Sequence, residues 1–274
     1  MHLFYVQGGG LGHLTRIDKL IRFLDLNKKD IVIITPSCFT EYFKQYTFIQ
    51  LSWNSTIIEW IEIISNTITI NNVESFYIDA FPFGIKGELF PVYEQFKTIN
   101  YIYIARILKW GNYIKNMPQL LKANYSNTLV LETVYSNHYM WIKQNSKTIT
   151  KIEASHMYNN NEQVPLIESS YYLIVHSGGK KDVIELCTKV AQELKDSTIP
   201  IFVVTQVNLK INNPKFIIKP KIYPVSQYFK YAKHIFTGVG FNLVNELKPY
   251  RYKHTMFPFN KLYDDQLFRK KHTI

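Results

Sequence analysis

Residues 3–13 read Leu3-Phe4-Tyr5-Val6-Gln7-Gly8-Gly9-Gly10-Leu11-Gly12-His13, an apolar run that passes directly into a glycine loop. Over residues 13–26, apolar side chains then recur with the spacing of one helix face. A buried strand that turns through glycines into an amphipathic helix is the opening unit of a parallel α/β sheet. We therefore expect an α/β fold.

The same alternation continues along the chain in two groups. The first group predicts strands at 3–7, 31–35, 47–51, 75–79, 101–104 and 127–131, with helices at 13–26, 38–45, 56–65, 88–98, 111–123 and 136–144. A polar, Asn-rich stretch at 156–163 indicates a linker. Beyond it we expect strands at 171–176, 200–205, 215–218, 234–237 and 254–257, with helices at 181–195, 225–232, 241–248 and from about 264. The pattern predicts two Rossmann-like domains, residues 1–160 and 161–274.

Composition excludes several classes of protein. With 274 residues, 46% of them hydrophobic, and two cysteines, the chain is neither disordered nor a disulfide scaffold. We expect Cys38 and Cys187 to be reduced core thiols, and no zinc-type spacing appears. The first strand follows Met1 and His2 without a signal peptide, and no apolar stretch reaches the length of a membrane span. These features predict a cytoplasmic protein.

The net charge of +11 is unevenly distributed. Residues 1–155 carry a net charge of +3 and residues 156–274 a net charge of +8. An excess of this kind is typical of proteins that bind nucleic acid, an anionic membrane or a phosphorylated ligand. Nucleic acid is disfavoured, because only 5 of the 32 basic residues are Arg and the aromatic residues are scattered as core residues would be.

The first glycine loop precedes His13. It lacks the third glycine of the dinucleotide fingerprint and the lysine of a P-loop, so NAD and ATP are disfavoured. His13 is expected at the carboxyl end of the first strand, where open α/β sheets bind ligands, and an imidazole there could take a proton from a hydroxyl. A histidine that merely caps the glycine turn is the alternative.

Two further glycine loops follow predicted strands. His176-Ser177-Gly178-Gly179-Lys180-Lys181 offers main-chain amides, a hydroxyl and two ammonium groups to a phosphate, although an ordinary strand-to-helix turn is the alternative. Thr237-Gly238-Val239-Gly240-Phe241-Asn242 opens a helix in which Glu246 stands one turn beyond Asn242. A carboxylate in that position could accept the hydroxyls of a ribose.

Taken in order, these pieces and the later Asp264-Asp265-Gln266 resemble glycosyltransferases of the GT-B fold. The strongest likeness is to glycosyltransferase family 28, which includes the N-acetylglucosaminyltransferase that forms lipid II. A more distant likeness is to the UDP-glycosyltransferases. The resemblance implies two Rossmann-like domains that face each other across a cleft.

The resemblance also implies roles for particular residues. On the acceptor side, Gly10 and Gly12 match the N-terminal loop and His13 its general base. Asp79 begins a segment, residues 79–89, that is shared with uncharacterised relatives, and Arg106 is a further acceptor-side candidate. The implied donor-binding residues are Ser177, Gly178 and Gly179 at the diphosphate, Gly238, Gly240, Phe241 and Asn242 at the phosphates and base, Glu246 at the ribose, and Asp265 with Gln266 at the transferred sugar.

The sequence also departs from the family pattern. Leu243 replaces a small hydroxyl residue, and Gly238 stands where one branch has His. The chain ends at Ile274, where relatives continue into helices that cross back to the N-terminal domain. Either this is a minimal version of the family's fold, or we expect domain closure to be organised differently, for example by a partner subunit.

The implied activity is a hexosyltransferase reaction that moves a sugar from a nucleotide-sugar, most simply a UDP-sugar, to an acceptor hydroxyl. It would invert the anomeric centre and use neither metal nor cofactor. The implied acceptor is a lipid-linked or small-molecule sugar of cell-envelope polysaccharide synthesis, and peripheral contact with the inner membrane face would suit it. The alternatives are a UDP-sugar 2-epimerase and a non-catalytic nucleotide-sugar-binding partner subunit.

Overall fold

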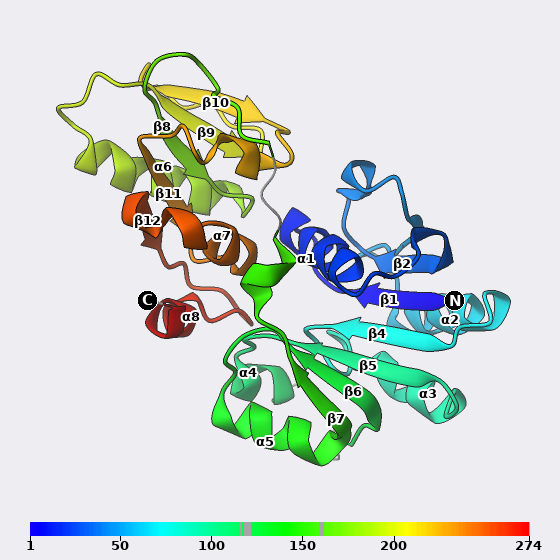
Figure 1. The fold of residues 1–274 in the computed structure, drawn as a ribbon. Helices are drawn as coiled ribbons and strands as arrows, with labels where there is room; N and C mark the ends of the chain where they lie inside the picture. The colour runs from blue at the N-terminus through cyan, green and yellow to red at the C-terminus, as the bar shows by residue number, and fades with distance from the viewer. Residues whose placement is uncertain (116, 118–121, 159–161, 274) are drawn as a thin grey trace. The chain divides into compact units, whose positions relative to one another are not determined.

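The computed structural model describes residues 1–115, 117, 122–158 and 162–273 (Figure 1). The chain forms two compact units. The first comprises Met1–Met157 with Leu262–Asp265, and the second comprises Tyr158–Lys261 with Gln266–Ile274. Each unit has its own parallel sheet.

The sheet of the first unit has the strand order β3-β2-β1-β4-β5-β6-β7, and all of its pairings are parallel. Its strands are β1 (His2–Val6), β2 (Ile31–Thr35), β3 (Thr47–Gln50), β4 (Ser75–Asp79), β5 (Asn100–Ala105), β6 (Tyr125–Val130) and β7 (Ser146–Lys151). The helices between them are α1 (Leu11–Phe23), α2 (Ile57–Ile70), α3 (Leu89–Gln95), α4 (Trp110–Ile114) and α5 (Ser136–Asn145). An all-parallel sheet of this kind is buried on both faces, which explains its β-branched and aromatic strands.

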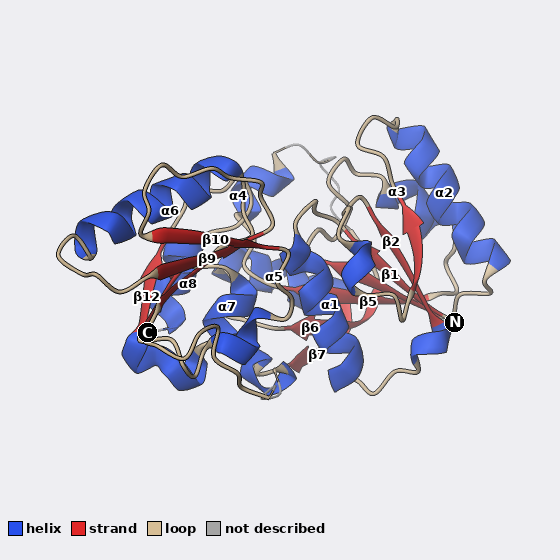
Figure 2. Cartoon of the chain, turned by 90° about the horizontal axis from the view of Figure 1, so that it is seen from above, coloured by secondary structure: helices blue, strands red, loops and turns tan. Residues whose placement is uncertain are grey.

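Alternate side chains of each strand serve opposite faces of the sheet. Leu3 and Tyr5 of β1 belong to a core cluster with Trp60 and Ile64 of α2. Phe4 points to the other face, where its ring stacks on Tyr77 with 4.3 Å between centroids. Figure 2 shows α1 and α2 on opposite sides of β1. The first unit is therefore a doubly wound sheet.

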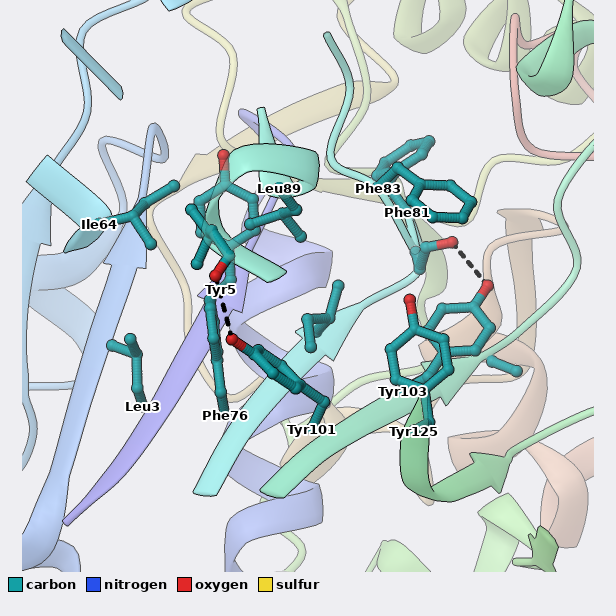
Figure 3. Close-up of a cluster of buried hydrophobic side chains, with 14 of the residues drawn as sticks. Leu3, Tyr5, Ile64, Phe76, Phe81, Phe83, Leu89, Tyr101, Tyr103 and Tyr125 are labelled. Atoms are coloured by element: carbon teal, nitrogen blue, oxygen red, sulfur yellow. Dashed lines mark hydrogen bonds between the residues drawn. The ribbon is translucent and has the colours of Figure 1, made fainter. Parts of the chain in front are cut away.

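The loop that follows β4 is fixed by buried tyrosine hydroxyls. Tyr103 donates to the carbonyl of Ala80 at 2.9 Å, and Tyr125 donates to that of Pro82 at 2.7 Å. Figure 3 shows Tyr103 and Tyr125 together, close to Phe81 and Phe83. Such bonds satisfy buried carbonyls that no helix or strand pairs. Tyrosine hydroxyls, and not a helix or strand, therefore hold this loop in place.

Glu88 closes the same loop from within. Its buried carboxylate accepts from Tyr5 at 2.5 Å and from the main-chain amide of Lys86 at 2.8 Å. Gly84 has a φ of +80°, and a Cβ there would stand 2.1 Å from the Glu88 carboxyl carbon. Glycine at position 84 thus permits the positive φ and leaves space for the Glu88 carboxylate.

The second unit repeats the architecture on a smaller scale. Its sheet has the order β10-β9-β8-β11-β12, again with parallel pairings throughout. The strands are β8 (Tyr172–Val175), β9 (Ile201–Thr205), β10 (Phe216–Pro220), β11 (His234–Gly238) and β12 (His254–Phe257). The helices are α6 (Lys180–Glu193), α7 (Phe241–Glu246) and α8 (Gln266–Thr273). Two apolar clusters, one containing Ile174 with Leu186 and the other Leu173 with Leu247, cover its two faces.

Most predicted elements are present, but two predicted helices are wrong and one strand was missed. The helices expected at 38–45 and 225–232 are only short 3₁₀ turns at Thr40–Tyr42 and Val225–Tyr228. The sequence interpretation missed β7, because Ile149 is the one apolar residue of this edge strand and the strand follows α5 without a loop. Part of the helix expected at 111–123 and part of the linker expected at 156–163 lie outside the described residues.

Both cysteines are free thiols, but only one lies in a core. Cys187 is buried on α6 as expected, whereas Cys38 is exposed, so its assignment to the core was wrong. Among the described residues, no helix combines the length and the apolar character needed to cross a membrane.

Candidate functional site

Each sheet has one point where the strand order reverses. From β1 the chain runs outward to β2 and β3, and then returns to β4 on the other side of β1. In the second unit the same reversal falls between β8 and β11. The carboxyl ends of strands at such a switch point border the crevice where open α/β sheets bind ligands. The residues at these two places are therefore the first candidates for function.

In the first unit, the switch point holds His13, Asp79 and Arg16. Asp79 is the last residue of β4 and is paired in register with Val6, while His13 lies in the first turn of α1. The Nδ1 atom of His13 lies 2.9 Å from Oδ2 of Asp79. The Arg16 guanidinium donates to both Asp79 oxygens, at 2.8 and 2.5 Å, and lies 3.1 Å from His13 Nδ1.

Burial determines the charges of this cluster. Desolvation lowers the pKa of His13, and the nearby Arg16 adds to this effect although Asp79 opposes it. Desolvation alone would raise the pKa of Asp79, but Arg16 and His13 outweigh it and hold that pKa well below its usual range. At neutral pH the imidazole is therefore neutral and the carboxylate ionised.

The carboxylate also decides where the proton sits on the ring. Because an ionised carboxylate only accepts hydrogen bonds, Nδ1 of His13 donates to Asp79, and Nε2 keeps its lone pair. One fifth of the His13 side chain is exposed, whereas Asp79 is fully buried. This arrangement presents an oriented base at the sheet edge, which favours the general-base interpretation of His13 over that of a turn cap.

The glycines before His13 differ in what they do. Gly8 has a φ of +134°, and a Cβ there would lie 2.5 Å from Nε2 of the imidazole. Gly10 caps α1 in an extended conformation, with no atom within 4 Å of the place where a Cβ would stand. Gly12 lies within the first turn of α1. Gly8 thus makes room for the histidine, and Gly10 leaves space beside the helix terminus.

Arg106 and Asp265 both contact partners within the first unit. Arg106 follows β5 and donates to Asp264 at 2.8 Å, and its charge also lowers the pKa of His13. Asp265 accepts a hydrogen bond from Tyr135. The short segment Leu262–Asp265 therefore brings two carboxylates to this unit.

The switch point of the second unit holds a second histidine, His176. It directly follows β8 and is buried, with Nε2 3.4 Å from Oδ2 of Asp182 on α6. Lys261 forms an ion pair with the same carboxylate. A Cβ on Gly178 would stand 2.4 Å from His176 Nε2, and one on Gly238 would stand 2.8 Å from its Cε1. These two glycines are in contact with the histidine ring.

The loop from Ser177 leads into α6, a helix of 14 residues. Ser177, Gly179, Lys180 and Lys181 are all exposed. Gly179 caps the helix in an extended conformation, and nothing lies within 4 Å of a Cβ built there. No side-chain hydrogen bond caps this end of α6, and the main-chain amides of its first turn face the loop.

The third predicted loop opens the short helix α7. Asn242 accepts a hydrogen bond from Tyr158 at 2.8 Å, and Glu246 is half-buried. Gly240 caps the helix with open space at its Cβ position, whereas the Phe241 ring is buried. The roles assigned to these residues at the donor remain predictions.

Gln266 and its neighbour Asp265 have hydrogen-bond partners in different units, and their predicted role at the transferred sugar stays a prediction. The buried Oε1 atom of Gln266 accepts from the main-chain amides of Val239 at 3.2 Å and Phe259 at 2.9 Å in the second unit. Arg269, one turn later on α8, donates to the carbonyl of Val239 at 2.9 Å. Gln266 thus holds the loop before α7, while Asp265 contacts Tyr135 in the first unit.

The sequence interpretation missed Arg16, Asp182 and Lys261, and it named His176 only as part of its loop. Arg16 had a usable signal, because it stands three residues after His13 and so shares its helix face. Asp182 and Lys261 are 79 positions apart, and no pattern in the sequence connects them. Within the part of the chain that the structure describes, no group of three or more His, Cys, Asp or Glu residues could hold a metal ion.

Comparisons with known proteins bear on the fold. No protein-family model matches the sequence, and a search of curated proteins finds no match. Among solved structures, the glycotransferase of kitacinnamycin is similar, with a TM-score of 0.59 and 12% identity over 99% of this chain and 83% of that one. MurG of Acinetobacter baumannii has a TM-score of 0.52 and 10% identity over 99% of this chain and 82% of its own.

A third similar structure is a UDP-GlcNAc 2-epimerase. The enzyme of Methanocaldococcus jannaschii, solved with UDP-GlcNAc and UDP, has a TM-score of 0.59 and 12% identity over 94% of this chain and 89% of its own. Identities this low describe the fold alone. Two parallel α/β sheets and these neighbours confirm the expected architecture: the chain has the fold of the GT-B glycosyltransferases.

Proposed function

We propose that the protein transfers a sugar from a nucleotide-sugar, most simply a UDP-sugar, to an acceptor hydroxyl with inversion at the anomeric carbon. The observation that carries this proposal is the neutral His13 imidazole oriented by ionised Asp79 at a sheet switch point. GT-B neighbours that act as glycosyltransferases support it through the fold.

In the proposed reaction, His13 Nε2 takes the proton of the acceptor hydroxyl as that oxygen attacks the anomeric carbon. The bond from this carbon to the diphosphate breaks, and the nucleoside diphosphate leaves with the bonding electrons. The resulting imidazolium is stabilised by Asp79 through the Nδ1 hydrogen bond. General-base assistance of this kind contributes about 10²- to 10⁴-fold in rate.

Arg16 has a positioning role in this proposal. Its guanidinium binds both oxygens of Asp79 and so fixes the carboxylate that orients the imidazole. It also balances the charge of a carboxylate that has no exposed surface. We infer that Arg16 keeps His13 neutral and aligned before the acceptor arrives.

The second unit is the proposed donor side. The first-turn amides of α6 and the lysines at 180 and 181 would meet the charge that develops on the diphosphate, without a metal ion. Ser177 would add a hydroxyl, and Glu246 would accept the hydroxyls of the ribose. The net charge of +8 over residues 156–274 suits an anionic donor.

Calorimetric titration with UDP, GDP and NAD tests the donor side. We expect UDP to bind, Glu246→Ala to weaken it about tenfold, and Glu185→Ala, on the exposed face of α6, to leave it unchanged. Failure of every nucleotide to bind would overturn the donor assignment. Unchanged affinity in Glu246→Ala would remove the ribose role alone.

The similarity to a UDP-GlcNAc 2-epimerase favours one alternative reaction. An epimerase would change the donor without any acceptor, whereas a transferase would leave the sugar configuration intact. Incubation with UDP-GlcNAc alone, followed by NMR of the recovered sugar nucleotide, separates the two. We expect no 2-epimer.

A further inference from the structure

Trp53 differs from the other three tryptophans of the chain in its exposure. Its side chain is 48% exposed, whereas Trp60, Trp110 and Trp141 are buried. It lies in the turn after β3, at the same carboxyl edge of the sheet as His13, because β1, β2 and β3 run parallel. An isolated exposed aromatic residue is common on protein surfaces, so the surroundings of Trp53 decide whether it has a binding role.

The Trp53 ring is held in a defined position. It packs at 60° against Trp60, with 5.7 Å between ring centroids. Trp60 is itself fixed, because its indole donates to the carbonyl of Ser52 at 3.0 Å. The amide of Ser55 closes the turn on the same carbonyl at 3.2 Å. The indole is thus a rigid, half-exposed surface and costs little entropy when a ligand packs on it.

The ring borders the glycine loop that precedes His13. A Cβ on Gly9 would stand 3.7 Å from Trp53 Nε1 and 4.0 Å from its Cζ2. The residue before it, Gly8, lies still closer to the His13 imidazole, since a Cβ there would stand 2.5 Å from Nε2. Since consecutive Cα atoms are about 3.8 Å apart, the indole and the imidazole border neighbouring residues of one loop. Both rings therefore lie beside the same short glycine loop.

His13 and the Trp53 indole would each bind a different part of a ligand ring. His13 needs a hydroxyl at its edge, and the indole needs a flat apolar face. A pyranose supplies both, since its hydroxyls lie around the rim and its C–H bonds form the face. An acyl chain supplies no hydroxyl whose proton His13 could accept.

We propose that Trp53 is the acceptor-recognition residue of the site and that the acceptor presents a sugar ring, which packs on the indole with one hydroxyl at His13. This inference rests on the proposed transfer reaction for the role of that hydroxyl. It assigns the acceptor class and does not depend on which nucleotide the donor carries.

Saturation-transfer-difference NMR tests the assignment without donor or turnover. The probes are the methyl glycosides of glucose, galactose, mannose and N-acetylglucosamine, with phenol and phosphatidylglycerol vesicles as competitors for an aromatic or a lipid site. We expect at least one glycoside to bind the wild-type protein saturably, with transfer strongest at the ring C–H protons.

Three variants locate the binding. Trp53→Ala should weaken the glycoside about tenfold or more, and Trp53→Phe should retain part of the affinity. Phe23→Ala is the matched control, because Phe23 is an exposed aromatic residue at the last position of α1, the helix end opposite His13, and should change nothing. Circular dichroism confirms that each variant is folded.

The inference is overturned if no glycoside binds or if Trp53→Ala binds the glycoside as tightly as the wild type. It is also overturned if phenol or the vesicles bind at Trp53 and no glycoside does. Failure of the proposed function gives a different result, since it appears as absent nucleotide binding with glycoside binding intact. The two claims therefore fail separately.

Discussion

The His13 Nδ1 atom lies 2.9 Å from the Asp79 carboxylate, although the two residues are 66 positions apart in the chain. The contact arises because β1 and β4 are neighbours in register, so the end of β4 meets the helix that follows β1. Arg16 completes the cluster from the next turn of α1. A buried ion pair and an oriented imidazole thus share one edge of the sheet.

Replacement of Asp79 by Asn should change the pH dependence of turnover. Asp79 raises the pKa of His13 against the effects of burial and Arg16, so its loss should lower that pKa further. The acid limb of kcat/KM should move to lower pH, while kcat falls about 10²-fold because the imidazolium loses its partner. A pH–rate profile of the variant measures both.

Asp18→Asn is the control for this experiment. Asp18 is a buried carboxylate on the same helix, where it accepts from Tyr46 and Gln45 at 2.9 Å. Its loss should lower stability without moving the acid limb. Equal shifts in the two variants would mean that the limb reports on folding and not on His13.

Buried histidines should make the protein less stable in acid. Burial lowers the pKa of His138 to about 3. Because the unfolded residue titrates near 6.5, only the unfolded chain takes up this proton as the pH falls from 7 to 5. His138 should thereby reduce the free energy of unfolding by about 2 kcal/mol at pH 5 relative to pH 7.

Urea denaturation at the two pH values measures this difference. In His138→Phe, which preserves a ring against Trp110, the loss between pH 7 and pH 5 should shrink by about that amount. His272→Gln removes an exposed histidine and should leave the loss unchanged. A wild-type pH dependence in His138→Phe would contradict the assignment.

Alanine at Gly178 or Gly238 should destabilise the second unit. At positions 178 and 238 the new Cβ would meet the buried His176 ring at 2.4 and 2.8 Å, and overpacking of this kind costs about 1–3 kcal/mol. Thermal unfolding measures the effect, and combining Gly178→Ala with His176→Ala should recover part of the loss.

Gly179→Ala separates packing from binding in the same loop. Its φ of −61° suits alanine and its Cβ position is open, so stability should be unchanged. If a diphosphate approaches this end of α6, the added methyl group should weaken UDP binding. A stable variant that binds UDP normally would move the diphosphate away from Gly179.

Removal of metal ions should leave the reaction intact. The proposed mechanism meets the leaving diphosphate with main-chain amides and lysines. Dialysis against EDTA should keep the turnover rate within about twofold, with no gain from added Mg²⁺ or Mn²⁺. A loss that Mg²⁺ restores would replace this part of the mechanism with a metal-assisted one.

Sequence patterns predicted the elements that bury apolar side chains. The strands β1, β2 and β9 are continuous apolar runs, and α1 has a clear helical period, so local composition reports their burial directly. The strand β7 escaped notice because an exposed edge strand needs no apolar run. In the segment 38–45 the loop buries Phe43, and the apolar residues there were mistaken for a helix.

The site was predictable only where it is local in sequence. His13 and Gly10 were visible because they follow a strand, and Asp79 came from a family resemblance. The packing of Gly178 and Gly238 against the His176 ring could not be predicted, because it depends on β8 and β11 being neighbouring strands. The sequence interpretation assigned those glycines to the donor, which stays a prediction, and the structure adds that they border the His176 ring.

The most direct test of the central claim is the turnover of His13→Ala with UDP-sugars and a panel of sugar acceptors, measured as UDP release. We expect kcat to fall about 10²- to 10⁴-fold while UDP affinity stays within about twofold of the wild type. A His13→Ala enzyme that retains near-full turnover would contradict the account, because the oriented imidazole would then have no part in the reaction.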